Sequence, residues 1–121
     1  MATPHVLLVE DSCVDRLVAS RVLKSCNIRV TAVEGPKQAL EFLNMEHDVN
    51  LILTDYCMPD MTGYDLLVEV KKSPKHNHLP VVITCTDDVP ARIKKCIDGG
   101  AKDYIIKPIK VADVPRLLSY I

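Results

Sequence analysis

Five short apolar segments, each followed by a stretch with helical periodicity, constrain the fold of this chain more than any other feature. They occupy residues 5–9, 28–33, 51–54, 79–84 and 102–106. Short, largely apolar segments are typical of strands in a parallel sheet covered on both faces. Strands that alternate with helices predict an α/β fold with right-handed crossovers between the strands. We therefore expect a doubly wound, five-stranded parallel sheet with five helices on its two faces.

Helix signals stand between these segments. Ser12 and Asp15 have the spacing of a capping box, and apolar residues at positions 14, 17, 18 and 22 then share one helical face. A last helix is expected from about residue 112 to the end, and the polar loop 73–78 should be exposed. Four further helix starts are indicated by Gly35 and Pro36, by Thr62 before a helix over 64–72, by Asp88 and Pro90, and by Pro115 as a first-turn proline. Gly99 and Gly100 indicate the end of the helix that starts near Pro90.

Length and charge limit the class of protein. The 121 residues, with 48% hydrophobic content, suit a single domain over residues 1–121. The net charge of −1 gives no overall basic field, so we expect no direct contact with nucleic acid. No apolar segment approaches the roughly 20 residues that a bilayer-spanning helix needs, and no signal peptide pattern opens the chain. We expect an intracellular protein, in the cytoplasm, the nucleus or both, without membrane contact.

The cysteine and histidine patterns do not indicate a zinc site. The five cysteines form no C-x-x-C pair, and their odd number argues against a disulfide framework. Their simplest interpretation is as small apolar residues in a reducing compartment. His76 and His78 lie two residues apart, but no neighbouring cysteine or carboxylate completes a metal-binding set.

Polar side chains follow four of the predicted strands at the point where each strand ends. They are Glu10 and Asp11, then Asp55, then Thr84 and Cys85, and finally Lys107. Functional groups of open parallel sheets gather beyond the C-terminal ends of the strands. Three carboxylates held close together repel one another and are tolerated around a cation, and oxygen ligands suit Mg²⁺. Asp55, which alone would be an ordinary loop aspartate, then becomes a nucleophile toward phosphorus, with Lys107 near the phosphoryl oxygens.

The polar residues, together with the prolines and glycines around them, resemble the receiver domains of two-component response regulators. The resemblance covers nearly the entire chain and implies a flavodoxin-like sheet with strand order 2-1-3-4-5. Two further passages look most like the short plant type-A regulators of cytokinin signalling. The general motifs are Glu10-Asp11, Asp55-x-x-Met58-Pro59-x-Met61-x-Gly63 and Lys107-Pro108, and the plant-like passages are Thr54-Asp-Tyr-Cys-Met-Pro and Val89-Pro-Ala-Arg92.

The resemblance assigns roles to the matching positions. Asp55 is the phosphoacceptor, and Glu10 and Asp11 are acids of the magnesium site. The magnesium ligands include Asp55 and are completed by the backbone carbonyl of Cys57. Lys107 pairs with the acceptor.

Two more positions follow from the same resemblance. The peptide bond that precedes Pro108 is cis, as is typical of the family. Tyr104 is the aromatic switch residue, whose ring moves inward on activation.

Position 85 departs from the family pattern. Counting without gaps from Asp55 places Cys85 where the family has a hydroxyl that contacts the phosphoryl group, and a thiol is a weak hydrogen-bond donor. Three interpretations remain open: Cys85 merely fills a small buried site, Thr84 or Thr86 supplies the hydroxyl, or phosphorylation couples weakly to Tyr104. The third leads to the hypothesis that Asp55 accepts phosphate normally while the conformational response is blunted.

The resemblance implies a phosphoacceptor in a phosphorelay. The phosphoryl donor is the histidine of a phosphotransfer protein docked over the first helix and the loops near Asp55, and we expect the receiver to be a monomer. It is not an enzyme beyond self-catalysed phosphoryl acceptance and autodephosphorylation. Because no output segment follows Ile121, we expect a receiver-only negative regulator of cytokinin signalling that acts by protein contact or by competing for phosphate.

Two alternatives belong to other functional classes. A pseudo-receiver would bind a partner without phosphorylation, but such proteins usually lack one of the acids or the lysine, and this chain has both. A phosphatase of similar topology would need a second acid just after Asp55, where Cys57 stands.

Overall fold

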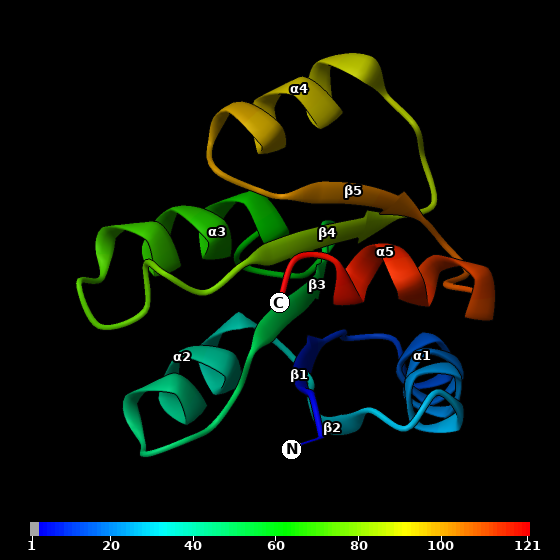
Figure 1. Ribbon diagram of the computed structural model, residues 1–121. Helices are drawn as coiled ribbons and strands as arrows, with labels where there is room; N and C mark the ends of the chain where they lie inside the picture. Colours follow the sequence, from blue (N-terminus) through cyan, green and yellow to red (C-terminus); the bar gives the residue numbers. More distant parts are fainter. Residues whose placement is uncertain (1–2) are drawn as a thin grey trace.

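The sheet of the computed structural model, which describes residues 3–121, has five parallel strands in the order β2-β1-β3-β4-β5 (Figure 1). The strands are β1 (His5–Val9), β2 (Arg29–Val33), β3 (Leu51–Asp55), β4 (Val81–Cys85) and β5 (Asp103–Ile106). Both the parallel sheet and its order are as predicted. The order reverses between β1 and β3, so the ends of these strands open a crevice where functional groups can meet.

Helices cover both faces of the sheet. Helices α1 (Cys13–Ser25) and α5 (Val114–Leu118) cover one face, and α2 (Pro36–Asn44), α3 (Gly63–Lys72) and α4 (Pro90–Asp98) cover the other (Figure 1). A short 3-10 turn, η1 (Val111–Asp113), precedes α5. The five α-helices of residues 3–121 confirm the doubly wound architecture.

The central strands divide their side chains between two cores. Every residue of β1, β3 and β4 is buried, as their apolar patterns predict. On β1, Leu7 and Val9 face α2 and α3, whereas Val6 and Leu8 face α1 and α5. Each fully buried leucine contributes about 2 kcal/mol through removal of apolar surface from water. The edge strand β2 is only partly buried, in agreement with its alternating sequence.

Three strands begin later than the sequence patterns predict, and for β5 the difference is one residue, since it starts at Asp103. β2 starts at Arg29 because the Ile28 amide donates to the Leu23 carbonyl (3.2 Å) and so belongs to the end of α1. β4 starts at Val81, since Pro80 has no amide proton for the ladder, although its carbonyl still accepts a bond from Ile52 (2.9 Å). The sequence patterns identify apolar residues, whereas pairing between strands also requires backbone amides that are free to donate hydrogen bonds.

Two helix starts differ from the predicted caps. Ser12 accepts a bond from the Asp15 amide (3.3 Å), but the Asp15 carboxylate does not return to Ser12, so the capping box is only half formed. Asp88 was wrong as a cap, because Val89 holds the N-cap position of α4 without a side-chain bond. By contrast, Thr62 and Asp65 form a complete capping box at the start of α3, one residue earlier than predicted.

The C-terminal helix is shorter than predicted. α5 contains five residues, with Pro115 in its first turn, and ends at Leu118 instead of running to the end of the chain. The amides of Tyr120 and Ile121 bond to carbonyls three residues back, the tighter pattern that often closes a helix. Gly99 and Gly100 end α4 as predicted, and Gly100 has a positive φ of 112° that glycine adopts at low cost.

Burial differs from the sequence pattern at two places. The apolar face of α1 lies in solvent, with exposed fractions of 69% for Val14, 50% for Leu17 and 39% for Val18, whereas the helix buries Ala19 and Leu23. The loop 73–78 was expected to be exposed, yet His76 is buried. Within residues 3–121, the structure contains no helix with the length and apolar character required to cross a membrane.

Candidate functional site

The acids and the lysine of the predicted site meet at the C-terminal edge of the sheet. Glu10 and Asp11 follow β1, Asp55 is the last residue of β3, and Lys107 follows β5. Carboxylate oxygens of Glu10, Asp11 and Asp55 lie within 4.8 Å of one another. Glu10 and Asp55 are buried, whereas Asp11 is exposed at the mouth of the site.

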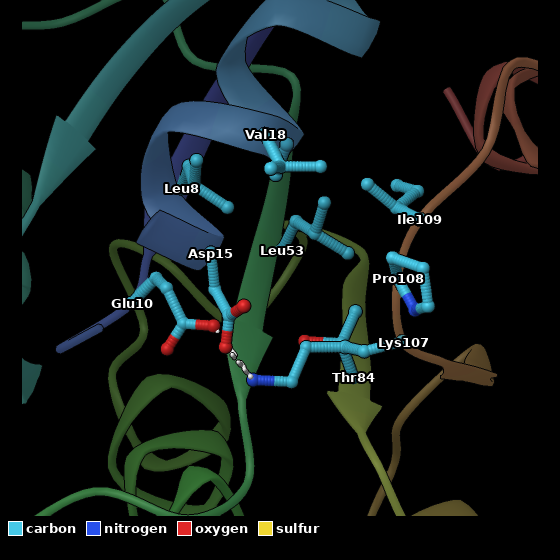
Figure 2. A pocket seen from close by; sticks show the side chains of 10 residues that line it. Leu8, Glu10, Asp15, Val18, Leu53, Thr84, Lys107, Pro108 and Ile109 are labelled. Carbon is cyan, nitrogen blue, oxygen red and sulfur yellow. Dashed lines mark hydrogen bonds and ion pairs between the residues drawn. The ribbon is translucent and has the colours of Figure 1, made fainter. Parts of the chain in front are cut away.

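Lys107 places its ammonium group between three carboxylates. Its Nζ lies 2.8 Å from Glu10 Oε1, 3.0 Å from Asp15 Oδ2 and 3.1 Å from Asp55 Oδ1. Figure 2 shows the first two acids and Lys107 converging from α1, the end of β1 and the end of β5. The contact with Asp55 is an ion pair without hydrogen-bond geometry, so the buried Oδ1 of Asp55 has no hydrogen-bond partner among the described residues.

The crowding of negative charge changes the acid–base behaviour of the site. Burial, together with the neighbouring Asp55, raises the pKa of Glu10 to about 7 even though Lys107 opposes the shift. Burial alone would lower the pKa of Lys107, but its hydrogen bonds to Glu10 and Asp15 and its ion pair with Asp55 outweigh that effect and raise the pKa. One lysine therefore does not fully compensate the acids around it.

The donor set fits a divalent cation with oxygen ligands. Three carboxylates converge, and one buried carboxylate oxygen has no hydrogen bond, which is the chemistry that a hard cation such as Mg²⁺ satisfies. The backbone carbonyl of Cys57 lies two residues beyond Asp55, and none of residues 3–121 donates a hydrogen bond to it. That carbonyl is thus free to serve as a further oxygen ligand.

Gly63 holds the loop after β3 close to the site. Its amide donates to the Tyr56 carbonyl (2.9 Å), and a Cβ at position 63 would collide with the backbone carbonyl oxygen of Asp55. The glycine of the sequence motif is thus required for close backbone approach rather than for an unusual φ.

The residues around β4 lie on different sides of the sheet. Thr84 is paired with Asp55 in the β3–β4 register, and its side chain lines the same pocket as Lys107 and Pro108 (Figure 2). Its hydroxyl donates to the Thr54 carbonyl (3.4 Å). Cys85 is 1% exposed and belongs to the core on the α3 and α4 side.

Tyr104 and the bond to Pro108 complete the predicted positions. The Tyr104 ring is 8% exposed and points inward, with its hydroxyl donating to the Asp87 carbonyl (2.8 Å). The Lys107–Pro108 bond is cis. Thr86 is exposed and makes no side-chain hydrogen bond among the described residues.

Two residues at the site were missed by sequence reasoning. Asp15 was interpreted only as a capping residue, although it lies in the first turn of the helix that follows Glu10 and Asp11, and its carboxylate contacts Lys107. Arg92 contacts Cys85 Sγ through Nη1 (3.2 Å) and stacks on the Tyr56 ring, 4.4 Å from the ring centroid. A basic residue in the first turn of α4 was the available signal, but only the fold shows that it reaches β4.

Comparisons with known proteins agree with this geometry. Residues 6–119 match the response regulator receiver domain. The chain is 66% identical to the two-component response regulator ORR12 and 65% identical to ORR13, both of rice (Oryza sativa subsp. japonica), over 121 residues that cover all of each protein.

Solved structures share the same fold. A putative response regulator from Chloroflexus aurantiacus superposes with a TM-score of 0.91 at 21% identity, with 98% of each chain covered. The receiver domain of a sensor histidine kinase from Pseudomonas aeruginosa has a TM-score of 0.85 at 29% identity, with 98% of this chain and 96% of that chain covered. Its active site cleft contains a coordinated magnesium ion. The chain therefore belongs to the receiver domain family of two-component response regulators, and its plant relatives are response regulators of rice.

Proposed function

We propose that the chain accepts a phosphoryl group on Asp55 from the phosphohistidine of a phosphotransfer protein. A carboxylate oxygen of Asp55 attacks phosphorus, and the bond between phosphorus and the histidine nitrogen breaks. The nitrogen keeps the electron pair, and the products are an acyl phosphate and a free imidazole. The observation that carries this proposal is the buried Asp55 oxygen that faces Lys107 without a hydrogen bond. It lies at the C-terminal edge of the sheet among Glu10, Asp11 and Asp15, and we call this cluster, with Lys107, the acidic edge.

The acids around Asp55 have a supporting role in this proposal. Glu10, Asp11, Asp55 and the backbone carbonyl of Cys57 would hold Mg²⁺. When bound, the ion supplies charge neutralisation for the incoming phosphoryl oxygens and for the carboxylates. The 2.8 Å contact with Lys107 holds Glu10 in place at the end of β1.

Lys107 must change partners when the phosphoryl group arrives. Its three present contacts are all with carboxylates, and the phosphoryl oxygens would replace part of them. Asp15 is the most exposed of the three partners, with 43% of its side chain accessible, and is therefore the contact that is released at the lowest cost. We expect Asp15 to compete with the phosphoryl group for Lys107.

The response of Tyr104 is the second part of the proposal. Because Cys85 is bonded to Arg92 rather than offering a hydroxyl, we propose that phosphorylation couples weakly to the inward Tyr104 ring. NMR spectra of the native protein and of Cys85→Thr, each with and without beryllofluoride, test this. The variant should show larger shifts around Tyr104, and identical shifts in both proteins would refute the blunted response.

The exposed apolar face of α1 suits the phosphotransfer partner. Val14, Leu17 and Val18 lie in solvent on the helix that begins beside Glu10 and Asp11, so a partner docked on them would bring its histidine to the acidic edge. Leu17→Asp should therefore slow phosphoryl transfer from the partner while leaving transfer from a small phosphodonor such as acetyl phosphate unchanged. An unchanged rate of transfer from the partner would place the docking surface elsewhere.

The last part of the proposal concerns the biological role. We propose that the protein acts inside the cell as a monomeric negative regulator of cytokinin signalling, without enzymatic activity beyond its own phosphorylation and autodephosphorylation. The end-to-end match with rice response regulators supports this role. Expression of the native protein should lower a cytokinin-responsive reporter in plant cells more than Asp55→Asn does, and equal repression by the two would contradict competition for phosphate.

The central experiment is transfer from a radiolabelled phosphotransfer protein in the presence of Mg²⁺. The native chain should acquire label, and Asp55→Asn should acquire none. Asp60→Asn is the matched control, because Asp60 is an exposed acid of the same loop whose positive φ of 71° asparagine also tolerates. This control should label like the native chain. Label retained on Asp55→Asn would overturn the assignment of the acceptor.

A further inference from the structure

Two histidines that are distant in the sequence meet at one surface pocket. The pocket lies between the loop after α2 and the loop after α3, which lead into the N-terminal ends of β3 and β4. The imidazole rings of His47 and His76 line it, with their centroids 5.9 Å apart and their planes tilted by 35°. His78 and the charged residues Glu46 and Lys75 line it as well. Sequence spacing associates His76 with His78 only, whereas the fold adds His47.

His76 is buried and firmly held, yet one of its ring nitrogens has no partner. The residue is 5% exposed, and its Nε2 makes no hydrogen bond with any of the described residues. Its backbone is fixed, because the His76 amide donates to the Ser73 carbonyl (3.1 Å) and the His76 carbonyl accepts from the Leu79 amide (2.9 Å). Lys71 Nζ also donates to the Leu79 carbonyl (2.8 Å). A buried polar atom that the protein leaves unpaired on a fixed backbone is a position for a ligand.

The ring of His47 is partly buried and is also positioned by its neighbours. The Phe42 ring stacks on it, with centroids 5.7 Å apart and planes at 26°. Its Nδ1 accepts a hydrogen bond from the Val49 amide (3.2 Å), so the proton of the neutral ring is on Nε2. Burial lowers the pKa of His47 and that of His76, so both rings are neutral near pH 7 and can offer a lone pair.

We propose that His47 and His76 bind one divalent transition-metal ion, such as Zn²⁺, through the Nε2 atom of each ring. With metal–nitrogen bonds of about 2.1 Å, two imidazoles that share one metal have centroids about 5 to 6 Å apart, and the observed 5.9 Å lies in this range. Imidazole nitrogen suits Zn²⁺ and Cu²⁺, whereas Mg²⁺ prefers oxygen ligands. Water completes the coordination, because no third histidine, cysteine or carboxylate of residues 3–121 converges on the pair. The proton of bound His47 moves to Nδ1, so the bond from the Val49 amide is lost.

Two exposed charges of the pocket should tune the affinity for the metal. Lys75, whose Nζ donates to the Asn44 carbonyl (3.4 Å), brings a positive charge that opposes a cation. Glu46 brings a negative charge that favours one. Lys75→Gln should therefore tighten Zn²⁺ binding and Glu46→Gln should weaken it, each by roughly two- to fivefold as expected for exposed charges. Weaker binding by Lys75→Gln would contradict a cation in this pocket.

The test is calorimetric titration of the full chain with Zn²⁺, in excess Mg²⁺ that competes at the acidic edge. His47→Gln and His76→Gln should each lower the Zn²⁺ affinity at least about tenfold, since loss of even an outer-shell partner of a ligand costs 10- to 100-fold. His78→Gln is the matched control, because it removes an exposed imidazole of the same pocket, and it should change the affinity less than about threefold. If His76→Gln is poorly folded, the partly buried His47 decides the result. Unchanged affinity in His47→Gln, or an equal loss in His78→Gln, would overturn the assignment.

NMR and thermal unfolding locate the bound metal without reference to phosphoryl acceptance. Zn²⁺ should shift the ring nitrogens of His47 and His76, and the Val49 amide should shift with them because its acceptor is lost. Zn²⁺ should also raise the unfolding midpoint of the native chain but not that of His47→Gln, since a ligand stabilises only the fold that binds it. Zn²⁺-induced shifts confined to the acidic edge or to the cysteines would place the metal elsewhere and overturn the site.

Discussion

Polar side chains cluster at both ends of the parallel strands, at the N-terminal edge and at the C-terminal edge of the sheet. Only the cluster at the N-terminal edge has a partner for every charge. At the N-terminal edge, His5 Nδ1 donates to Asp48 (2.7 Å) and its Nε2 lies 2.8 Å from the Thr31 hydroxyl. Arg29 pairs with the second oxygen of Asp48 (2.8 Å). We call these four residues, with Asn50 bonded to the His5 amide (2.9 Å), the His5 cluster. Each of its charges has an oppositely charged or hydrogen-bonding partner.

The pKa values of the two edges move in opposite directions. Hydrogen bonds from His5 and Arg29 lower the pKa of Asp48 to about 2, so folding favours its charged form. At the acidic edge, burial and Asp55 raise the pKa of Glu10 to about 7, so folding disfavours its charged form. The His5 cluster stabilises the fold as it stands, whereas the acidic edge is left short of positive charge. Such local conflict is typical of functional sites.

Loss of the lysine at the acidic edge should have the largest effect. Lys107→Met removes the cation that contacts Asp55, and phosphoryl acceptance should fall by roughly 100-fold or more because a preorganised donor to the phosphoryl oxygens is lost. Arg29→Met removes the corresponding cation of the His5 cluster and should change the rate by less than about twofold, since its ion pair is at the surface. Transfer rates from a labelled donor are the measurement.

Circular dichroism and thermal unfolding of both variants show whether a lower rate reflects a lost fold. If Lys107→Met stays folded and accepts phosphate at the native rate, phosphoryl acceptance does not use this lysine. The difference in charge pairing between the two edges would then be unrelated to function.

The pH dependence of stability should distinguish the edges next. Glu10 has a folded-state pKa of about 7 against an ordinary value of 4.5, so the unfolded chain releases this proton first as the pH rises. Without metal, the free energy of unfolding should therefore fall by about 2 kcal/mol between pH 4.5 and pH 7 through this group. Urea unfolding in EDTA measures the slope.

Two controls accompany the pH series. Glu10→Gln has no titrating carboxyl and should lose most of the slope, and Mg²⁺ should remove it in the native chain by favouring the carboxylate. A native slope that is the same with and without Mg²⁺ would show that Glu10 is not part of a metal-binding edge.

The contrast between the edges was partly predictable from the sequence. Apolar strands that end in Glu10, Asp55 and Lys107 predicted the acidic edge because all parallel strands in a sheet end on the same side. The pairing of Asp15 with Lys107 was not predictable, since a capping box and an ion pair share one local signal and only the position of β5 decides between them. The His5 cluster was also missed, because its members come from three separated segments with no common motif.

The two candidates at positions 84 and 85 show a second limit. Thr84 and Cys85 are neighbours in sequence, so a one-residue change in strand register exchanges the sides on which they lie. The register places Thr84 opposite Asp55 and turns Cys85 toward Arg92. No residue count can give this outcome, because it depends on how β4 pairs with β3.

Neutralisation of one carboxylate at each edge should change the free energy of unfolding in opposite directions. Both changes should be smaller than the pH effect of Glu10. Asp55→Asn removes one of the repelling carboxylates, so without metal the free energy of unfolding should rise by about 1 kcal/mol. Asp48→Asn removes a satisfied carboxylate and should lower the stability. Urea unfolding in EDTA at neutral pH tests both. Destabilisation by Asp55→Asn would indicate that Lys107 already compensates the acids.

The smallest expected effect concerns the acid limb of the His5 cluster. The pKa of Asp48 is about 2 in the folded chain against an ordinary 3.8, so its stabilising contribution is complete above about pH 4 and is lost as the pH falls through 2. The effect is modest because 62% of the Asp48 side chain is exposed and water screens its ion pairs. The difference in urea midpoint between the native chain and Asp48→Asn should shrink over this interval. Arg29→Met keeps the bond between His5 and Asp48, so it should remove only part of the stabilisation that Asp48 provides. A difference that stays constant down to pH 2 would mean that the His5 cluster does not depend on the charge of Asp48, and the balance inferred for that edge would be wrong.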